Sequence, residues 1–331
     1  MDKLKFAIPA GSLAKATFDF FGRSGYKISG TERTYRPTIN DPEIEMKILR
    51  PQEIPVFVSE GLQDLGITGQ DWVRENRADV EILQNLEYGK IRLVVAVPKT
   101  ASDDINVFME DIWARGKNFR VSTEYLNIGS EYLKGLPAYK KRFGDADPMI
   151  VTPWWRKGDN ARAKLFLSFG ATEAKPPENS DCIIDVTETG STIEANNLKI
   201  IDTVMRSAAV LIANKKAFQD PEKQEKMYDI VALLKGVVDG SKRIHIFVNV
   251  KKANLQKLLT ELPALKNPTI APLADENWVS VNTVIEKDCL IGILPKIRKL
   301  AQGLVVYEPR QVLALDEITR RKEGKCAADS K

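Results

Sequence analysis

The sequence predicts an α/β protein with two α/β units and a third, smaller α+β domain. Up to about residue 218, short apolar runs alternate with helix-like segments, which is typical of α/β layers around a largely parallel sheet. The alternation starts afresh after Pro98. From residue 222 the order becomes a helix followed by β-α-β-β-α-β, the split βαβ order of a ferredoxin-like domain.

The first unit opens with a strand, a loop and a helix. Residues 3–9 predict the strand, and Gly11 and Ser12 precede apolar residues at helical spacing that stop at Gly22 and Gly25. Four further elements are expected in this unit. They are a strand at 43–49, a helix at 54–61, a strand at 64–69 that runs into a glycine loop, and a buried strand at 92–98.

The second unit repeats the alternation. Its expected elements are a strand at 119–125, a helix at 130–144 with an interruption at Gly135 and Pro137, a strand at 149–155, a short element and loop at 164–177, and a strand that begins at Cys182. Two strands within 198–218 could return to the first unit. We therefore expect one unit over 1–97 plus 201–221 and the other over 98–200.

The third region begins near Pro221. Residues 222–238 predict a long amphipathic helix. The remaining elements are a strand at 243–250, a helix at 254–265, strands at 269–274 and 278–286, a helix at 289–303 and a strand at 304–312. We expect this domain to span 222–315 and residues 316–331 to form a frayed tail.

The composition excludes several classes of protein. With 49 basic and 45 acidic residues, the net charge of +4 is too balanced to indicate nucleic-acid binding. The longest apolar runs, such as 93–97 and 208–213, are far shorter than a membrane span. Three cysteines without a CxxC pair and one histidine predict neither a zinc site nor a disulfide framework. The start lacks a signal-peptide pattern, so we expect reduced cysteines and a cytoplasmic protein.

One motif indicates chemistry. Residues 181–197 read DCIIDVTETGSTIEANN: an apolar strand, an acid, and then hydroxyls and a glycine before a helix. Hydroxyls and exposed backbone N–H groups form an anion cradle, and Gly190 lets the backbone approach closely. The carboxylates need a sugar or a cation, and a ribose 5-phosphate with a nearby divalent ion meets both needs. The alternative is a capped helix start, with Ser191 or Thr192 as N-cap and Glu194 nearby.

In that interpretation the residues divide into two groups. Asp185 and Glu188 bind the ribose hydroxyls or Mg²⁺, Asp185 reaching the metal through the substrate. The 5-phosphate binds the loop residues Thr187, Thr189, Gly190, Ser191 and Thr192.

The chain resembles the ATP phosphoribosyltransferase family in its long form, which has a C-terminal regulatory domain. The resemblance covers about 1–315 and lies in motifs that follow one another in the family's order. These are RPQEIPVFVSEGLQDLGITGQDW at 50–72, RLVVAVP at 92–98, RVSTEY at 120–125, GATEAKPP at 170–177, DCIIDVTETGSTIEANNLKIID at 181–202 and NPTIAPLADENWVSV at 267–281.

This resemblance implies a fold and a reaction. The first two units become lobes around a cleft, as in periplasmic binding proteins. Adenine N1 of ATP displaces pyrophosphate from phosphoribosyl pyrophosphate, with Mg²⁺, in the first step of histidine synthesis. The product is phosphoribosyl-ATP. Catalysis would rest on positioning and electrostatics, and no protein nucleophile is needed.

The first-lobe motifs are then expected to bind the nucleotide, together with Gly11 and Glu173. Arg50 follows a strand, where a guanidinium can bind phosphate bidentately, although it could also form a surface ion pair. Thr68, Gly69 and Asp71 stand at a strand-to-loop transition, where α/β proteins commonly bind ligands. Asp71 could instead cap the next helix. Glu124 is a weaker candidate. Trp154 and Trp155 could stack on adenine, although core packing is favoured for them.

One departure from the family concerns the first loop. The family usually has P-K-G-R-L, whereas residues 9–13 here read P-A-G-S-L, with Ala10 and Ser12 in place of two cations. Backbone N–H groups could still hold an anion, and Lys15 could supply charge. A catalytically degenerate paralogue is therefore an alternative, as are a two-lobed ligand-binding or sensor protein and a phosphoribosyltransferase that acts on a free base.

The third domain has no evident catalytic task. By resemblance it is ACT-like and binds L-histidine as a feedback inhibitor, in a homohexamer that exchanges with dimers. Asn249, Thr269 and Leu273 lie on or beside strand ends that could face a partner, so they are the candidate effector residues. Each could also be a turn or core residue.

Overall fold

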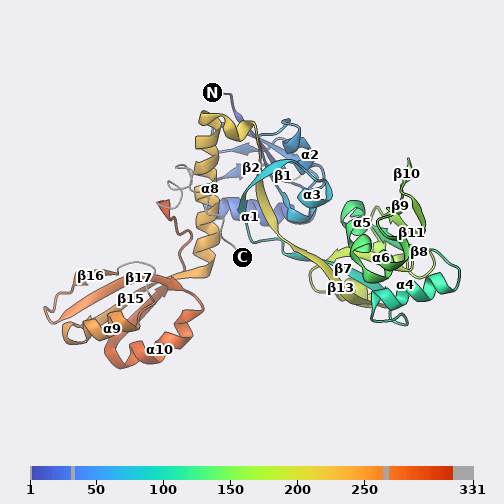
Figure 1. The fold of residues 1–331 in the computed structure, drawn as a ribbon. Helices are drawn as coiled ribbons and strands as arrows, with labels where there is room; N and C mark the ends of the chain where they lie inside the picture. Colours follow the sequence, from blue (N-terminus) through green and yellow to red (C-terminus); the bar gives the residue numbers. More distant parts are fainter. Residues whose placement is uncertain (1, 31–33, 264–267, 316–331) are drawn as a thin grey trace.

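The computed structural model describes residues 2–30, 34–263 and 268–315. Figure 1 shows an N-terminal lobe, a second lobe beside it and a C-terminal domain at the end of a long helix. Within the described residues, no helix has the length and apolar character required to cross a bilayer.

The first lobe is built on a five-stranded mixed sheet. The strand order is β4 (Ile44–Leu49), β1 (Leu4–Pro9), β5 (Leu65–Gly69), β14 (Ala209–Asn214) and β6 (Val80–Asn85). β1 is parallel to β4 and β5, whereas the late strand β14 returns antiparallel to β5. The parallel strands therefore end at the same edge of the sheet, where the glycine-rich turns after β1 and β5 emerge.

Helices cover the sheet of the first lobe on both faces. A short helical turn (Gly11–Leu13) leads into α1 (Ala14–Ser24), which ends at Gly25 with φ +99°. α1 packs with the long helix α8 (Pro221–Lys242) over one core cluster, and α2 (Ile54–Ser59) packs over the other. A two-stranded ribbon, β2 (Ile28–Ser29) and β3 (Thr38–Ile39), lies beside them.

The expected start of the third domain at residue 222 is wrong. The apolar stripe of α8 is buried in the core of the first lobe, where Met227, Ile230 and Leu234 have no exposed surface. This apolar face packs against side chains of β-strands that lie some 200 residues earlier in the sequence. The order of the elements along the chain does not reveal that contact. α8 is thus part of the first lobe, and Figure 1 shows it alongside that lobe with its far end at the C-terminal domain.

The second lobe has a seven-stranded sheet. The strand order is β10 (Arg156–Lys157), β9 (Pro148–Val151), β11 (Asn160–Leu167), β8 (Phe119–Thr123), β12 (Cys182–Thr187), β7 (Ile91–Pro98) and β13 (Leu198–Ser207). β7 and β13 belong wholly to this sheet, although the expected boundaries at 97 and 201 would divide them between lobes. They pair antiparallel from Leu198 opposite Pro98 to Ser207 opposite Ile91, so the chain changes lobe near residues 90 and 208.

Four helices surround this sheet: α4 (Ile105–Ala114), α5 (Leu126–Gly135), α6 (Pro137–Phe143) and α7 (Ser191–Ala195). The expected helix at 130–144 is confirmed as a pair interrupted at Leu136, but its first half begins earlier, at Leu126. α4 was not predicted. The core of the lobe is rich in aromatic contacts, such as Trp113 with Phe119 and Phe143.

The C-terminal domain confirms the split βαβ order. Its sheet runs β16 (Thr269–Pro272), β17 (Trp278–Glu286), β15 (Arg243–Lys251) and β18 (Ala301–Tyr307), and its helices are α9 (Leu255–Glu261) and α10 (Cys289–Leu300). β18 begins at Ala301, so the helix ends three residues before the expected Gly303. After β18 the chain returns to the first lobe, where Val312 donates its N–H to the Gly236 carbonyl of α8.

Candidate active site

A cleft of about 600 Å³ lies between the two lobes. It lies at the carboxyl ends of the β1, β5 and β12 strands, which is where open α/β sheets commonly bind ligands. Seven of the predicted site residues line it: Gly11, Arg50, Gly69 and Asp71 from the first lobe, and Glu173, Asp185 and Glu188 from the second. Glu124, the weaker candidate, lines it as well.

Thr68 is a predicted site residue that does not face the cleft. Its side chain is fully buried, and its Oγ1 donates to the Pro51 carbonyl oxygen at 2.7 Å. This bond holds the turn after β4 against β5. Thr68 therefore supports the loop that carries Arg50 rather than lining the cavity.

Arg50 stands at the end of β4 and is the cation among the cleft-lining residues of the first lobe. Within the described ranges its guanidinium makes no ion pair or hydrogen bond. A Cβ built on Gly11, which has φ +73°, would come 3.9 Å from Arg50 Nη1, so the first loop and this guanidinium are close neighbours. Ala10 and Ser12 also line the cleft here.

Asp71 joins the lobes. Its Oδ2 accepts a hydrogen bond from Tyr125 Oη of the second lobe at 2.6 Å, and its Oδ1 accepts one from Ser207 Oγ at 2.6 Å. Asp71 lies near the start of α3 (Gln70–Glu75), but Gly69 is the N-cap and no side chain caps the helix. The capping alternative is therefore wrong, and both carboxylate oxygens are bonded within the protein.

A second carboxylate also bridges the lobes. Glu75, at the end of α3, accepts hydrogen bonds from the backbone N–H groups of Asn127 at 2.8 Å and Ile128 at 2.9 Å. It thereby satisfies the first amides of α5, in the manner of an N-terminal cap. Burial raises the pKa of Glu75, and these amide bonds partly offset that rise. Glu75 and Tyr125 could not be predicted from local pattern, because their bonding partners lie more than 50 residues away in the sequence.

Asp185 lies on β12 with its carboxylate largely desolvated. Its pKa is raised to about 6, mainly by burial and also by the nearby charges of Glu173 and Glu124, although hydrogen bonds from the Val186 N–H and the Thr172 side chain partly offset this rise. Burial also raises the pKa of Glu124, which a hydrogen bond with Gln52 of the opposite lobe lowers. The cleft thus gathers acids on the side of the second lobe, opposite Arg50.

In the loop at residues 187–192, which reads TETGST, the side-chain hydroxyls form hydrogen bonds within the loop. Thr187 Oγ1 accepts the Gly190 N–H at 2.8 Å, and Thr189 Oγ1 lies 3.0 Å from Ser191 Oγ. Gly190 has φ +90°, which requires glycine, and it is the N-cap of α7. The alternative of Ser191 or Thr192 as a side-chain cap is therefore wrong. Glu188 reaches the cleft, whereas Thr187, Thr189, Gly190, Ser191 and Thr192 lie beside it.

Trp154 and Trp155 are not core residues, contrary to the favoured expectation. They are 72% and 48% exposed at the turn between β9 and β10, and Trp154 meets the equally exposed Phe169 edge to face. The strand expected over 149–155 ends at Val151, so the two rings fall on a turn rather than on a buried face. Neither tryptophan lines the cleft.

The candidate effector residues lie at the sheet face of the C-terminal domain that α9 and α10 do not cover. Alternate residues of β15 are buried, which places the exposed Asn249 on the open face. Thr269 pairs with Asn282 across β16 and β17. Leu273 follows β16 and donates its N–H to the Trp278 carbonyl at 3.1 Å. Asn282 Oδ1 is buried and has no hydrogen-bond partner among the residues that the structure describes, so this face contains a polar atom open to a further contact.

Comparison with known proteins matches both parts of this architecture. A family model described as ATP phosphoribosyltransferase matches residues 50–236, and a model of the C-terminal domain of the same family matches 241–310. The ATP phosphoribosyltransferases of Solibacter usitatus and Koribacter versatilis are each 38% identical to this chain, covering 94% of it and 99% of their own length. The chain belongs to the ATP phosphoribosyltransferase family.

The structural comparison agrees with this assignment at the level of fold. An ATP phosphoribosyl transferase (HisG:HisZ) complex from Thermotoga maritima superposes with a TM-score of 0.54 at 23% identity, over 71% of this chain and 98% of that chain. As an ATP phosphoribosyltransferase, the chain is a transferase of histidine biosynthesis, and it carries the family's C-terminal domain. The two-lobed fold expected from the sequence is confirmed.

Proposed function

We propose that the interlobe cleft is the site where this ATP phosphoribosyltransferase joins ATP to phosphoribosyl pyrophosphate, with release of pyrophosphate. The observation that carries this proposal is the convergence of Arg50 from one lobe with Asp185 and Glu188 from the other on a single cavity. A cation and a pair of acids suit a substrate that offers both phosphates and ribose hydroxyls.

The second lobe binds the phosphoribosyl group. Asp185 and Glu188 accept hydrogen bonds from the ribose hydroxyls. The 5-phosphate lies against the TETGST loop beside the cleft. Its hydroxyls now bond to one another and to the Gly190 N–H, so they would exchange these bonds for phosphate oxygens.

The first lobe binds the nucleotide. Arg50 takes the phosphate groups of ATP, because its guanidinium faces the cleft without a competing acid among the described residues and can bind phosphate in bidentate fashion. The turns at Gly11 and Gly69 bring backbone close to the ligand. Asp71 has both oxygens engaged, so its contribution is to hold the lobes in register rather than to contact the nucleotide.

The acids of the cleft fit a magnesium ion. The ionised form of Asp185 is disfavoured by burial and by the charges of Glu173 and Glu124, and a bound cation would relieve that cost. No three potential ligands cluster within the described residues, so the protein would supply one carboxylate and the substrate the remaining oxygens. When bound, Mg²⁺ would neutralise charge on the pyrophosphate.

Catalysis then rests on position and charge. Two substrates held across the cleft meet with adenine N1 in line with the ribose C1, and the interlobe bonds of Asp71 and Glu75 limit their relative motion. Arg50 stabilises charge on the phosphates, and Asp185 favours the positive charge that develops on the ribose. This chemistry requires no covalent intermediate with the protein.

The C-terminal domain senses L-histidine in this proposal. Asn249, Thr269 and Leu273 lie at its uncovered sheet face, and the unsatisfied Asn282 Oδ1 gives that face a polar atom for a ligand or a second chain. A homohexamer that exchanges with dimers would provide the two states that feedback inhibition needs.

We also propose that the protein is located in the cytoplasm.

One assay tests the function. Purified protein is mixed with ATP, phosphoribosyl pyrophosphate and Mg²⁺, and phosphoribosyl-ATP is followed with and without L-histidine. Product that falls with histidine supports both halves of the proposal, whereas product insensitive to histidine removes the sensor role. Bound substrates without product would instead support a ligand-binding protein that lacks turnover.

A further inference from the structure

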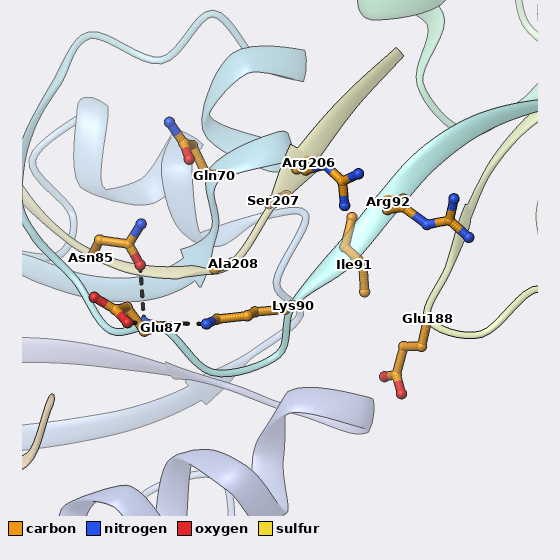
Figure 2. A pocket seen from close by; sticks show the side chains of 10 residues that line it. All are labelled: Gln70, Asn85, Glu87, Lys90, Ile91, Arg92, Glu188, Arg206, Ser207 and Ala208. Atoms are coloured by element: carbon orange, nitrogen blue, oxygen red, sulfur yellow. Dashed lines mark hydrogen bonds and ion pairs between the residues drawn. The ribbon is translucent and has the colours of Figure 1, made fainter. Parts of the chain in front are cut away.

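A second cavity of about 480 Å³ lies where the chain passes between the lobes. We call it the hinge cavity; it is lined by the crossings before β7 and after β13, and Figure 2 shows its side chains. It shares Ile91 and Glu188 with the cleft but none of the cleft's other lining residues. Apart from Glu188, the proposed reaction uses none of the residues that line this cavity.

Two arginines stand opposite each other in this cavity. Arg92 of β7 is the register partner of Arg206 of β13. Opposed residues on antiparallel strands have Cβ atoms about 5 Å apart, and like charges placed so are destabilising. Figure 2 shows the two guanidinium groups extending from neighbouring strands at the same end of the cavity.

Neither arginine has an acid to neutralise it. Among the described residues, no ion pair or side-chain hydrogen bond joins Arg92 or Arg206 to any group. The acids that line the cavity do not fill this role. Glu87 lies 4.0 Å from Lys90 and also pairs with Lys242, and Glu188 makes no ion pair with any residue in the described ranges. The arginine pair thus leaves about two positive charges facing a cavity.

We propose that the hinge cavity binds a phosphoryl anion between Arg92 and Arg206. A tetrahedral phosphoryl group accepts hydrogen bonds from two guanidinium groups at once and removes the repulsion between them. The chemistry is shared by inorganic phosphate, pyrophosphate and the phosphate tail of a nucleotide. The site adjoins the cleft at Ile91 and Glu188, but its two arginines have no part in the proposed reaction, so it can be tested independently of that reaction.

The position of the cavity gives the anion a mechanical role. Arg92 and Arg206 belong to the sheet of the second lobe, whereas Gln70, which also lines the cavity, begins α3 of the first lobe. The Gln70 N–H donates to the Ala208 carbonyl at 3.0 Å, directly beside the crossing. An anion held here contacts both crossings and so favours one angle between the lobes.

The test observes the arginines directly. In ¹⁵N-labelled full-length protein, Arg92→Gln and Arg206→Gln each assign one Nε–Hε signal by its loss. Inorganic phosphate, pyrophosphate and ADP are then titrated separately at constant ionic strength. We expect saturable shifts of both signals with at least one of these anions, and comparison of the three identifies its source. Shifts that rise linearly with concentration for every anion, or no shifts, would overturn the proposal.

A binding measurement provides the second arm. Calorimetric titration of the preferred anion into the Arg92→Gln/Arg206→Gln double variant should give a dissociation constant at least about tenfold weaker than wild type. The control is Arg115→Gln/Arg298→Gln, which removes the same charge from exposed positions. To separate the cleft, the titration is repeated on Arg50→Gln, which should retain the hinge signal. Equal weakening in the control would show general electrostatics rather than a site.

Discussion

The hydroxyl of Tyr125 donates to Asp71 Oδ2 at 2.6 Å, and this bond joins the two lobes beside the cleft. It is reinforced by stacking of Tyr125 on Trp72, whose ring centroids are 4.5 Å apart. The other oxygen of Asp71 accepts from Ser207, the last residue of β13. A single buried carboxylate therefore connects α3, the start of α5 and the hinge.

The first prediction concerns this bond. Tyr125→Phe should lower the free energy of unfolding by about 1–3 kcal/mol, because it leaves a buried carboxylate oxygen without its donor. Denaturant unfolding measures the effect. The matched control is Tyr132→Phe, whose hydroxyl donates to the exposed Asp202 within the second lobe at 2.7 Å and should cost less. Equal losses in both variants would contradict a special role for Asp71.

The second prediction concerns the acids of the cleft. Asp185→Asn combined with Glu188→Gln should lower kcat/KM by about 100-fold or more while the circular dichroism spectrum stays unchanged, since hydrogen bonds that develop with charge are lost. Glu194→Gln, an exposed change on the neighbouring α7, is the control and should retain activity. Wild-type rates in the double variant would remove these residues from the ribose site.

The third prediction concerns pH. Because Asp185 acts as a carboxylate and its pKa is raised to about 6, kcat/KM should fall about tenfold per pH unit below pH 6. In Asp185→Asn this acid limb should disappear from the residual activity. A profile that is unchanged by the substitution would assign the limb to another group.

The raised pKa of Asp185 should also make the free energy of unfolding depend on pH. A carboxyl group with a folded pKa above its ordinary value of 3.8 binds more protons folded than unfolded, so its contribution to stability declines as pH rises from about 4 to 6. At pH 7 and without Mg²⁺, Asp185→Asn should therefore be more stable than wild type by about 1–2 kcal/mol. A variant destabilised at pH 7 would show that the carboxylate is already compensated.

The fourth prediction concerns the first loop, where Ala10 and Ser12 line the cleft. The double variant Ala10→Lys/Ser12→Arg should remain active. Its KM for a phosphate-bearing substrate should be a few-fold lower, because the new cations would add about one contact with a phosphate group. Lys15→Gln tests whether the exposed Lys15 now supplies this charge, and should raise the same KM if it does. An inactive double variant would mean that the loop serves another purpose.

The fifth prediction concerns histidine. Asn249→Ala with Thr269→Ala in the full chain should raise the half-inhibiting concentration of histidine about tenfold, the cost of about one lost polar contact. Thr260→Ala, on the helix side of the same domain, is the control. Truncation near residue 222 is unsuitable as a test, because it would strip α8 from the core of the first lobe. Unchanged inhibition would place the effector elsewhere.

The sequence predicted those parts of the fold that depend on local pattern. Buried strands such as β1, β5 and β12 read as short apolar runs, and the glycine breaks that end α1 and divide α5 from α6 are local as well. The lobe boundaries were not predictable in this way. β7 and β13 have the same apolar character as the strands of the first lobe, and only their mutual pairing shows that both belong to the second sheet.

In the candidate site, too, local sequence motifs were predictable and long-range contacts were not. Arg50, Asp185 and Glu188 were predicted from recognisable motifs at or near strand ends, and all three line the cleft, although their roles stay a prediction. The role of Asp71 was missed because it depends on Tyr125 and Ser207, which lie 54 and 136 residues away. The exposure of Trp154 and Trp155 was not predicted for another reason. The strand ends at Val151 and a turn follows, so the two rings do not lie on the buried face that a longer strand would have given them.

α8 has a consequence for how the domains communicate. Its 22 residues form a helix about 33 Å long, and the apolar face of this helix is packed in the core of the first lobe. β15 starts at the very next residue, and the Lys287 N–H donates to the Lys242 carbonyl across that junction at 2.8 Å. α8 and β15 are therefore joined without a linker, so we expect a change in the orientation of the C-terminal domain to act on the core of the first lobe through α8.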